Sequence, residues 1–453
     1  MTTQSTKSDS NETTAAVQSY AADSGRVATL ARQIENGTLR PVDLVQRYLD
    51  RMREVEPAVQ AWREVDAENA LTAAERLGDE ARQGRVRGPL HGIPVGIKDI
   101  IDVVGLPTRG NSKARADIAP ATADAEVVAR LRLAGAIVLG KTHTTEFAYF
   151  DPSPARNPHN IEHTPGGSSS GSAAAVASGT VPLALGTQTM ASVNRPAAYC
   201  GIAAFKPSTQ LLSTFGVLPL SPAFDTVGCF GSTVADAVAL FDALCHDFTR
   251  MAAPKDSGTE MGEVVVLDDP ILGDATADIL AARDAVADRL SEAGIPFRRA
   301  ASPVSFAELF NHHLCAMEYE IGRIYAPLLF KAGELVGAKL AETIRRGGSI
   351  SDEAYYQSRR ALATARERFW STMPRMATIL FPATPATAPR GIAWTGDPKY
   401  ISPWTALGGP IVTLPAGIAE NGLPVGVLHC GRPGNDAVFA RKACRLAAAA
   451  GEF

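Results

Sequence analysis

Hydrophobic residues recur at helical spacing in three successive segments that begin shortly after residue 25. In the first segment Val27, Leu30 and Ile34 fall on one face of a helix. Helices are therefore expected over residues 26–36, from Pro41 onward, and over residues 67–83. Residues 1–22, by contrast, are small and polar without any periodicity, so we expect them to form a disordered tail.

From residue 89 onward, short apolar runs alternate with helical segments. Strands are expected over residues 93–97, 136–139, 263–267, 296–300, 378–381 and 409–414, and helices over residues 127–134, 172–178 and 275–293. This alternation favours an α/β fold. Neither a repeat nor a linker is evident, so residues 23–453 are expected to form one unit. The prediction is a single large α/β/α sandwich, with a central mixed twisted sheet covered by helices on both faces.

The composition of the 453-residue chain is that of an ordinary globular protein, with 45% hydrophobic and 20% charged residues. Its formal charge is 44 − 48 = −4 without a long basic run, which argues against a nucleic-acid partner. The six cysteines form no CxxC pair or Cys/His cluster, so no metal site is expected. No membrane span and no secretory signal are recognisable. We therefore expect a cytoplasmic protein without membrane association.

Lys98 closes the apolar run 93–97 and is the first candidate for chemistry. A lysine at the end of a strand usually reaches solvent, and for a single lysine this interpretation stays open. Strand alternation directs Lys98 and Asp99 to opposite faces of the sheet, so the carboxylate need not neutralise the amine. Burial without an acidic partner lowers the pKa of a lysine by several units from about 10.4. The neutral amine is then a general base.

Residues 164–179 form a glycine- and serine-rich run directly before a helix of small residues. The run is either a flexible turn or a loop with a chemical role, and a phosphate-binding loop is disfavoured because the GxxxxGK[ST] order is absent. Its serines Ser168, Ser169 and Ser170 would lie near the positive end of the helix, where an alkoxide is favoured over an alcohol. Ser192 lies in a further run of small and polar residues and carries no signal alone.

Taken together, these segments resemble the amidase signature family, which consists of serine hydrolases that act on C–N bonds. Lys98 stands in a GIKD run, and Ser168 is the first serine of a GGSS run. The spacing from Ser168 to Ser192, 192 − 168 = 24 residues, agrees with the family pattern. The resemblance extends from about residue 26 to the C-terminus and is weakest between about 250 and 375. It also includes residues 140–142, 225–228 and 422–426.

The resemblance implies a role for each of these residues. Neutral Lys98 would take a proton from Ser168, which would take one from Ser192, the nucleophile that forms an acyl-enzyme. Ser168 would follow a cis peptide bond. The implied oxyanion hole consists of the backbone N–H groups of Thr189, Met190, Ala191 and Ser192. The implied supporting residues are Gly166, Gly167, Ser169, Ser172 and Gln188. No metal or organic cofactor is implied.

The segment around Ser192 departs from the family pattern at several positions. Gln188 replaces an aspartate, Met190-Ala191 replaces a pair of glycines, and Asn194 replaces an arginine, with Arg195 one place later. Either the loop needs no positive φ, or its geometry has moved. The bulky Met190 would reshape the acyl pocket, and Gln188 lacks a charge that would act on Lys98. We therefore expect an altered substrate scope.

The resulting hypothesis is an amidohydrolase that cleaves C–N bonds other than peptide bonds in linear amides, with carbamates (urethanes), anilides or esters as further substrates. An alternative from the same family is the glutaminase, or ammonia-donating, subunit of an aminoacyl-tRNA amidotransferase. A third is a non-catalytic binding protein that kept the fold. A small-molecule substrate and a monomer or homodimer are expected.

A variable, helix-rich part over about residues 250–375 is expected to cover the pocket. Its aromatic residues either line that pocket or pack in the core and on helix surfaces: Phe310, Tyr319, Tyr325, Phe330, Tyr355 and Tyr356.

Overall fold

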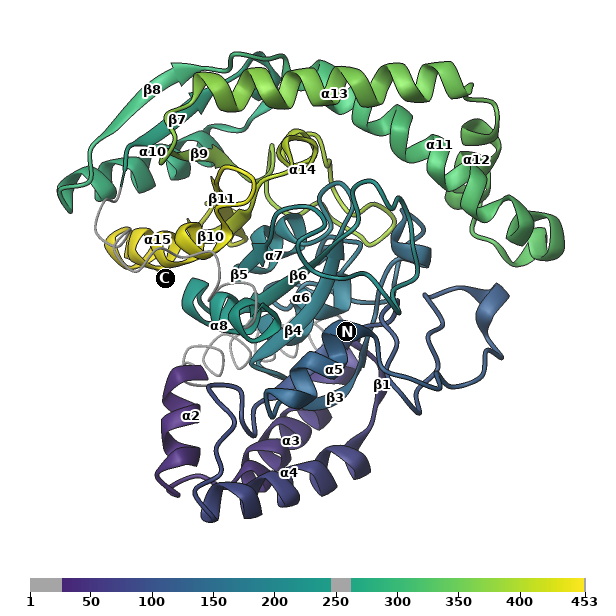
Figure 1. Ribbon diagram of the computed structural model, residues 1–453, viewed down its shortest axis with the longest axis vertical. Coiled ribbons are helices and arrows are strands. Elements are labelled where there is room, and N and C mark those ends of the chain that lie inside the picture. The colour runs from purple at the N-terminus through teal and green to yellow at the C-terminus, as the bar shows by residue number, and fades with distance from the viewer. Residues whose placement is uncertain (1–26, 246–261, 452–453) are drawn as a thin grey trace, which may run out of the picture.

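The computed structural model describes residues 27–245 and 262–451 (Figure 1). The tail expected over residues 1–22 lies outside the described residues. The three expected N-terminal helices are present as α2 (Val27–Glu35), α3 (Pro41–Val59) and α4 (Ala67–Arg82). In α2 the buried residues are Val27, Leu30 and Ile34, the stripe that the spacing predicted.

One mixed sheet of 11 strands runs through the molecule. In spatial order the strands are β1 (Trp62–Val65), β3 (Ile137–Thr142), β2 (Pro94–Lys98), β4 (Leu183–Gln188), β6 (Thr226–Gly231), β5 (Ala203–Lys206), β10 (Ile411–Ile418), β11 (Pro424–Cys430), β9 (Thr378–Pro382), β7 (Val264–Asp268) and β8 (Phe297–Ala301). Strand β2 pairs in parallel with β3 and β4, and β7 does so with β8 and β9. The other strand pairs are antiparallel. The predicted mixed sheet is confirmed.

Helices cover both faces of this sheet. Gly228 and Gly231 of β6 lie three residues apart and therefore face opposite sides. A Cβ atom at Gly228 would collide with Val193 at the start of α7 (Asn194–Cys200), whereas one at Gly231 would collide with Ala237 of α8 (Val234–Leu244). Helices α7 and α8 thus lie on opposite faces, and the predicted α/β/α sandwich is confirmed.

The remaining helices complete these layers and the periphery. They are α5 (Glu126–Leu133), α6 (Ser170–Ala177), α10 (Ala277–Glu292), α14 (Ser402–Leu407) and α15 (Asp436–Ala449), with short 3-10 turns η1 (Lys113–Arg115), η2 (Glu146–Ala148), η3 (Pro270–Asp274) and η4 (Gly333–Leu335). Helix α6 is buried along its whole length and packs against α7 and β4, which its small residues permit. No helix of the described residues is long and apolar enough to cross a membrane.

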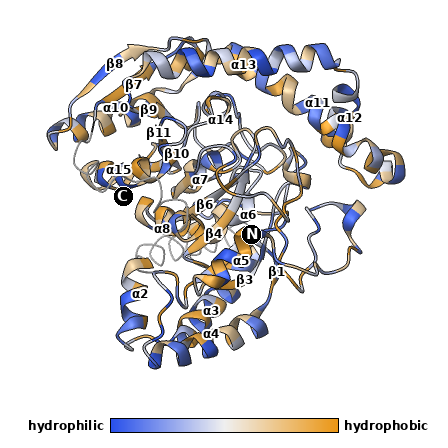
Figure 2. Cartoon of the chain, in the orientation of Figure 1, coloured by the Kyte–Doolittle hydropathy of each residue, from blue (hydrophilic) through white to orange (hydrophobic). Residues whose placement is uncertain are grey.

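The helix-rich part of the chain crosses the upper part of the molecule in Figure 1. It consists of α11 (Phe306–Ala332), α12 (Ala338–Gly348) and α13 (Asp352–Thr372). Helix α11 packs against α12, α13 and α14. Figure 2 shows long hydrophilic stretches on α13, whereas α8, which lies on the sheet, is largely hydrophobic. These outer helices therefore bury only one side each.

Several strands were not predicted from the pattern of apolar residues, among them β4 and β6. Both contain glycine, and all of their residues are buried. A strand buried on both faces shows no alternation of polar and apolar positions, so its periodicity cannot be recognised. Both strands lie at the centre of the sheet, between β2 and β5.

Candidate active site

Lys98 is the last residue of β2, and its side chain is completely buried. Its Nζ lies 2.7 Å from Oγ of Ser168 and 2.8 Å from Oγ1 of Thr187, so its close partners are neutral hydroxyls. Burial lowers the pKa of Lys98 well below its usual value, and the attraction of Asp225 opposes this shift only in part. The surroundings therefore favour an uncharged amine.

Asp99 turns to the other face of the sheet, as strand alternation predicted. Lys141 of β3 lies in register with Ile97, and its Nζ is 3.0 Å from Oδ1 of Asp99. Both side chains of this ion pair are buried, and Lys141 donates a further hydrogen bond to Oγ1 of Thr108 at 3.1 Å. The carboxylate that follows Lys98 in the sequence thus pairs with a different lysine.

Ser168 stands two residues before α6, and the peptide bond between Gly167 and Ser168 is cis, as the resemblance implied. The carbonyl oxygen of Ser168 accepts a hydrogen bond from the N–H of Thr145 at 3.1 Å. Helix α6 lies against the backbone next to it, because a Cβ atom at Gly171 would come within 2.2 Å of the carbonyl oxygen of Ala61. Only glycine permits this contact.

Two hydrogen bonds join the segment of Ser168 to the segment of Ser192. The N–H of Ser169 donates to the carbonyl oxygen of Ser192 at 3.3 Å. From the first turn of α7, Nη2 of Arg195 donates to the carbonyl oxygen of Gly167 at 2.9 Å. The structure thus brings Lys98, Ser168 and the segment of Ser192 into one place, although they come from distant parts of the sequence.

Arg195 was not among the predicted site residues. Its guanidinium is buried and also donates to the carbonyl oxygen of Gly396 at 2.5 Å and to Oγ1 of Thr395 at 3.0 Å. Burial lowers its pKa to about 10, against the opposing attraction of Tyr199 and Asp397. The signal available in the sequence was a charged residue inside a run of small and apolar ones.

Gln188 holds the start of α7 instead of acting on Lys98. Its Oε1 accepts hydrogen bonds from the N–H groups of Val193 and Asn194 at 2.9 and 3.0 Å. Its Nε2 donates to Oγ1 of Thr405 at 2.9 Å, and that hydroxyl donates to the carbonyl oxygen of Met190 at 2.7 Å. An uncharged amide is sufficient for these contacts.

The loop that precedes Ser192 does not require glycine. Neither Met190 nor Ala191 is among the described residues with positive φ, so the first of the two alternatives for this loop holds. None of the described residues accepts a hydrogen bond from the N–H groups of Met190, Ala191 or Ser192. These groups are thus free to bind an oxyanion.

The supporting serines tie α6 to the sheet. Ser169 Oγ donates to the carbonyl oxygen of Thr187 and accepts from its N–H, both at 3.2 Å. Ser172 Oγ donates to the carbonyl oxygen of Leu185 at 2.9 Å and lies 2.7 Å from Oγ1 of Thr142. These serines thus fix the backbone around Ser168.

Asp225, directly before β6, organises the other side of the loop. Its Oδ1 accepts from Oγ1 of Thr189 at 2.5 Å, and its Oδ2 accepts from the N–H groups of Leu220 and Ser221 at 2.8 and 3.0 Å. Burial raises its pKa, while these hydrogen bonds lower it. The sequence showed Asp225 only as part of a matching run, because its partners are distant in the chain.

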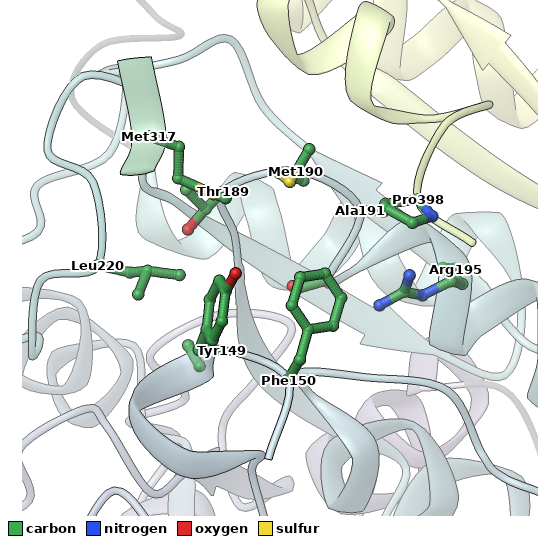
Figure 3. A pocket seen from close by; sticks show the side chains of 11 residues that line it. Tyr149, Phe150, Thr189, Met190, Ala191, Arg195, Leu220, Met317 and Pro398 are labelled. Carbon is green, nitrogen blue, oxygen red and sulfur yellow. The ribbon is translucent and has the colours of Figure 1, made fainter. Parts of the chain in front are cut away.

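A pocket of about 280 Å³ opens beside Ser192 (Figure 3). Its walls are mostly apolar, and the rings of Tyr149 and Phe150 lie 4.8 Å apart in an edge-on arrangement. The lining residues are Ala148, Tyr149, Phe150, Thr189, Met190, Ala191, Ser192, Arg195, Leu220, Met317 and Pro398. Met190 lines the pocket as expected, and Met317 of α11 closes it from the helix-rich part.

The six aromatic residues considered for this pocket do not line it. Phe330 and Tyr356 are 92% and 60% exposed, and Tyr319 stacks on Tyr355 with ring centres 4.2 Å apart. Tyr325 donates a hydrogen bond to the carbonyl oxygen of Pro219 at 2.5 Å. Packing within the helix-rich part and exposure at its surface account for these five, and Phe310 packs against the core.

The wall between Thr145 and Asp151 has an unusual backbone. Phe147 and Ala148 have φ values of 46° and 63°, two consecutive left-handed residues that are not glycine. This conformation costs roughly 1–2 kcal/mol per residue. It is held by a hydrogen bond from the N–H of Phe147 to the carbonyl oxygen of Gly110 at 2.9 Å.

Residues 27–245 and 262–451 contain no group of three or more His, Cys, Asp or Glu side chains that would hold a metal ion.

A sequence profile of the amidase family matches residues 43–439 of the chain. Two curated relatives are each named as a subunit of glutamyl-tRNA(Gln) amidotransferase, the same one in both organisms. The relative from Symbiobacterium thermophilum is 31% identical over 460 residues, which cover 90% of this chain and 93% of the relative. The relative from Roseiflexus castenholzii is 32% identical over 456 residues, which cover 90% and 92%.

Solved structures with similar folds include two amidases. The peptide amidase from Stenotrophomonas maltophilia is 27% identical and aligns with a TM-score of 0.77, covering 93% of this chain and 96% of that one. A second structure, described as an amidase, is 29% identical and aligns with a TM-score of 0.82, covering 94% and 98%.

Proposed function

This chain belongs to the amidase family of hydrolases that act on C–N bonds, and from that premise we propose that it cleaves neutral linear amides by means of Lys98, Ser168 and Ser192. The observation that carries the proposal is the 2.7 Å contact between Lys98 Nζ and Ser168 Oγ. The amine in that contact has no carboxylate at hydrogen-bonding distance among the described residues, and burial lowers its pKa. A buried neutral amine beside a serine hydroxyl has the properties of a general base.

In the proposed mechanism, Lys98 takes the proton of Ser168 while Ser168 takes the proton of Ser192. The Oγ of Ser192 attacks the substrate carbonyl, and the N–H groups of Met190, Ala191 and Ser192 stabilise the oxyanion. The proton then returns through Ser168 to the leaving nitrogen, and the C–N bond breaks. Water attacks the acyl-enzyme by the same relay and releases the acid.

The walls of the pocket support a substrate with an apolar or aromatic substituent. Tyr149, Phe150 and Leu220 lie on one side, and Met190 and Met317 on the other (Figure 3). Such a pocket stabilises apolar groups by removing them from water. Carbamates, anilides and esters present the same carbonyl to Ser192, so they belong in the substrate panel beside amides.

The test is a panel of amides, p-nitroanilides, carbamates, esters and glutamine, combined with fluorophosphonate labelling of the purified protein. We expect one adduct, at Ser192, and loss of all amide hydrolysis when it is blocked. Ser192→Ala should lower turnover by roughly 10⁴-fold or more while leaving the fold intact, because it removes one small oxygen atom. An adduct elsewhere, or near wild-type turnover in this variant, would contradict the proposal.

The curated relatives favour a second candidate, the glutaminase subunit that donates ammonia in an aminoacyl-tRNA amidotransferase. Such a protein would require partner subunits and tRNA. The residues that line the pocket include Arg195, which would attract the carboxylate of glutamine, but no carboxylate for its ammonium group. Glutamine hydrolysis measured alone and with the partner subunits of the Symbiobacterium thermophilum relative distinguishes the candidates. Hydrolysis of glutamine alone among the panel, stimulated by those partners, would favour the second.

A further inference from the structure

The pocket wall Ala148–Phe150 is held from outside by the N-terminus of α12. Oε2 of Glu146 accepts a hydrogen bond from the N–H of Gly337 at 2.7 Å. Asp151 accepts from the N–H groups of Lys339 at 3.2 Å and Leu340 at 2.8 Å. The first N–H groups of a helix have no partner within the helix and carry its positive dipole, so carboxylates stabilise them.

Helix α12 also contacts both aromatic residues of this wall. The side-chain amine of Lys339 donates to the carbonyl oxygen of Phe150 at 3.2 Å. Oγ1 of Thr343 donates to the hydroxyl of Tyr149 at 2.8 Å. The wall is therefore bound to α12 at each of its ends and along its length.

The start of α12 leaves no space for a side chain at Gly337. A Cβ atom there would lie 2.2 Å from Oε2 of Glu146 and 2.4 Å from Cγ of Asp151. The φ of Gly337 is −57°, a value that any residue can adopt, so the two carboxylates and not the backbone require glycine. At the other end of the same helix, a Cβ atom at Gly348 would meet no atom within 4 Å.

We propose that Glu146 and Asp151 are positioning residues that set the shape of the apolar part of the substrate pocket. With Gly337, Lys339 and Leu340 they form a unit that we call the wall clamp. The clamp holds the left-handed turn in which Tyr149 and Phe150 face the pocket, and so determines affinity for substrates with a bulky apolar or aromatic acyl group. This inference rests on the proposed amide hydrolysis and specifies its substrate class.

The test compares Gly337→Ala with Gly348→Ala, which add one methyl group to opposite ends of α12. Gly337→Ala should push the carboxylates away and raise KM for benzamide about tenfold, with kcat within about twofold. The KM for acetamide, whose acyl group is too small to need the aromatic wall, should stay within about twofold. Gly348→Ala should change neither value. A role in stability alone would not separate KM from kcat, nor benzamide from acetamide.

Asp151→Asn provides a second disruption that adds no atoms to the helix. The amide keeps one acceptor but turns an N–H₂ group toward an N–H group, so KM for benzamide should rise about threefold, again without a change for acetamide. Its matched control is Glu342→Gln, which removes an exposed carboxylate from the same helix at a distance from the wall. If Gly337→Ala fails to fold, this pair decides.

Equal ratios of the benzamide to the acetamide KM in the clamp variants and their controls would overturn the inference. Failure of the proposed function looks different, because the wild-type protein would then show neither hydrolysis nor an adduct at Ser192. In that case calorimetric binding of benzamide decides. Binding weakened by Gly337→Ala and not by Gly348→Ala supports the clamp, and equal binding overturns it.

Discussion

Two lysines on neighbouring strands of one sheet are buried to the same extent and yet meet opposite surroundings. Lys98 on β2 contacts the hydroxyls of Ser168 and Thr187, whereas Lys141 on β3 forms an ion pair with Asp99. Burial lowers the pKa of both lysines, but only Lys141 has a carboxylate at hydrogen-bonding distance that opposes the shift. A difference of one position in register places the two amines on opposite faces of the sheet.

A third lysine shows that a lowered pKa does not by itself define a site. Lys206, at the end of β5, is fully buried, and burial lowers its pKa to about 7. Its Nζ donates to the carbonyl oxygen of Pro207 at 2.5 Å, an atom that has no proton to exchange. The hydroxyl partner of Lys98, more than its burial, distinguishes it from the other two.

The largest expected effect comes from removing the amine of Lys98. Lys98→Met should lower kcat for amides by roughly 10²–10⁴-fold, and for esters by less, because an amine leaving group needs the returned proton. The midpoint of urea unfolding should be unchanged or higher, since a buried polar group is lost. Steady-state assays and urea titration of the same preparation check both. Amide turnover close to wild type would remove the basis of the comparison.

Removing the other amine should have the reverse effect. Lys141→Met leaves Asp99 buried without a partner, and the free energy of unfolding should fall by about 3–5 kcal/mol. The kcat per folded molecule should stay within about threefold, because Lys141 lies on the far face of the sheet. Urea titration and active-site labelling measure these quantities. The double variant Lys141→Met/Asp99→Leu should regain much of the stability, and its failure to do so would show that the ion pair is not the cause.

The pH dependence of kcat/KM sharpens the comparison further. Activity should rise with pH as Lys98 loses its proton, and then level off. The attraction of Asp225 raises the pKa of Lys98, so Asp225→Asn should move this rise to lower pH, by roughly one unit or less. Amide hydrolysis by both proteins over a series of buffers gives the two profiles. A shift toward higher pH would mean that Asp225 does not act on Lys98 through its charge.

The smallest effect is expected at Gln188. Its side chain holds the N–H groups of Val193 and Asn194, so Gln188→Glu should keep these contacts. The rise in activity with pH should move by no more than a few tenths of a unit, less than in Asp225→Asn. A larger displacement than that of Asp225→Asn would restore the initial interpretation, in which the charge at position 188 acts on Lys98.

Much of the candidate site was accessible from the sequence, because Lys98, Ser168 and Ser192 stand in short runs whose residue types are themselves informative. Their partners were less accessible. Thr187 and Asp225 gain their roles from hydrogen bonds between segments far apart in the chain. A threonine or aspartate of this kind looks ordinary until the strands are paired.

The fold shows the same division. Helices with one buried face, such as α2, were predicted within about two residues, since their apolar stripe repeats every three to four positions. The buried strands β4 and β6 were missed, although they form the centre of the sheet. The pocket wall was also unpredicted: Met317 reaches it from α11 and Leu220 from a loop, and only tertiary packing brings the two together.

The distribution of the site along the chain has a consequence for how such a protein can diversify. Lys98, Ser168 and Ser192 lie within the contiguous stretch 94–200, while Met317 and Pro398 are contributed from far downstream. Recombination between related genes at a point after this stretch can therefore exchange the downstream surfaces that meet the substrate and leave the reactive groups untouched. A library of such chimaeras would vary selectivity while inheriting one chemistry.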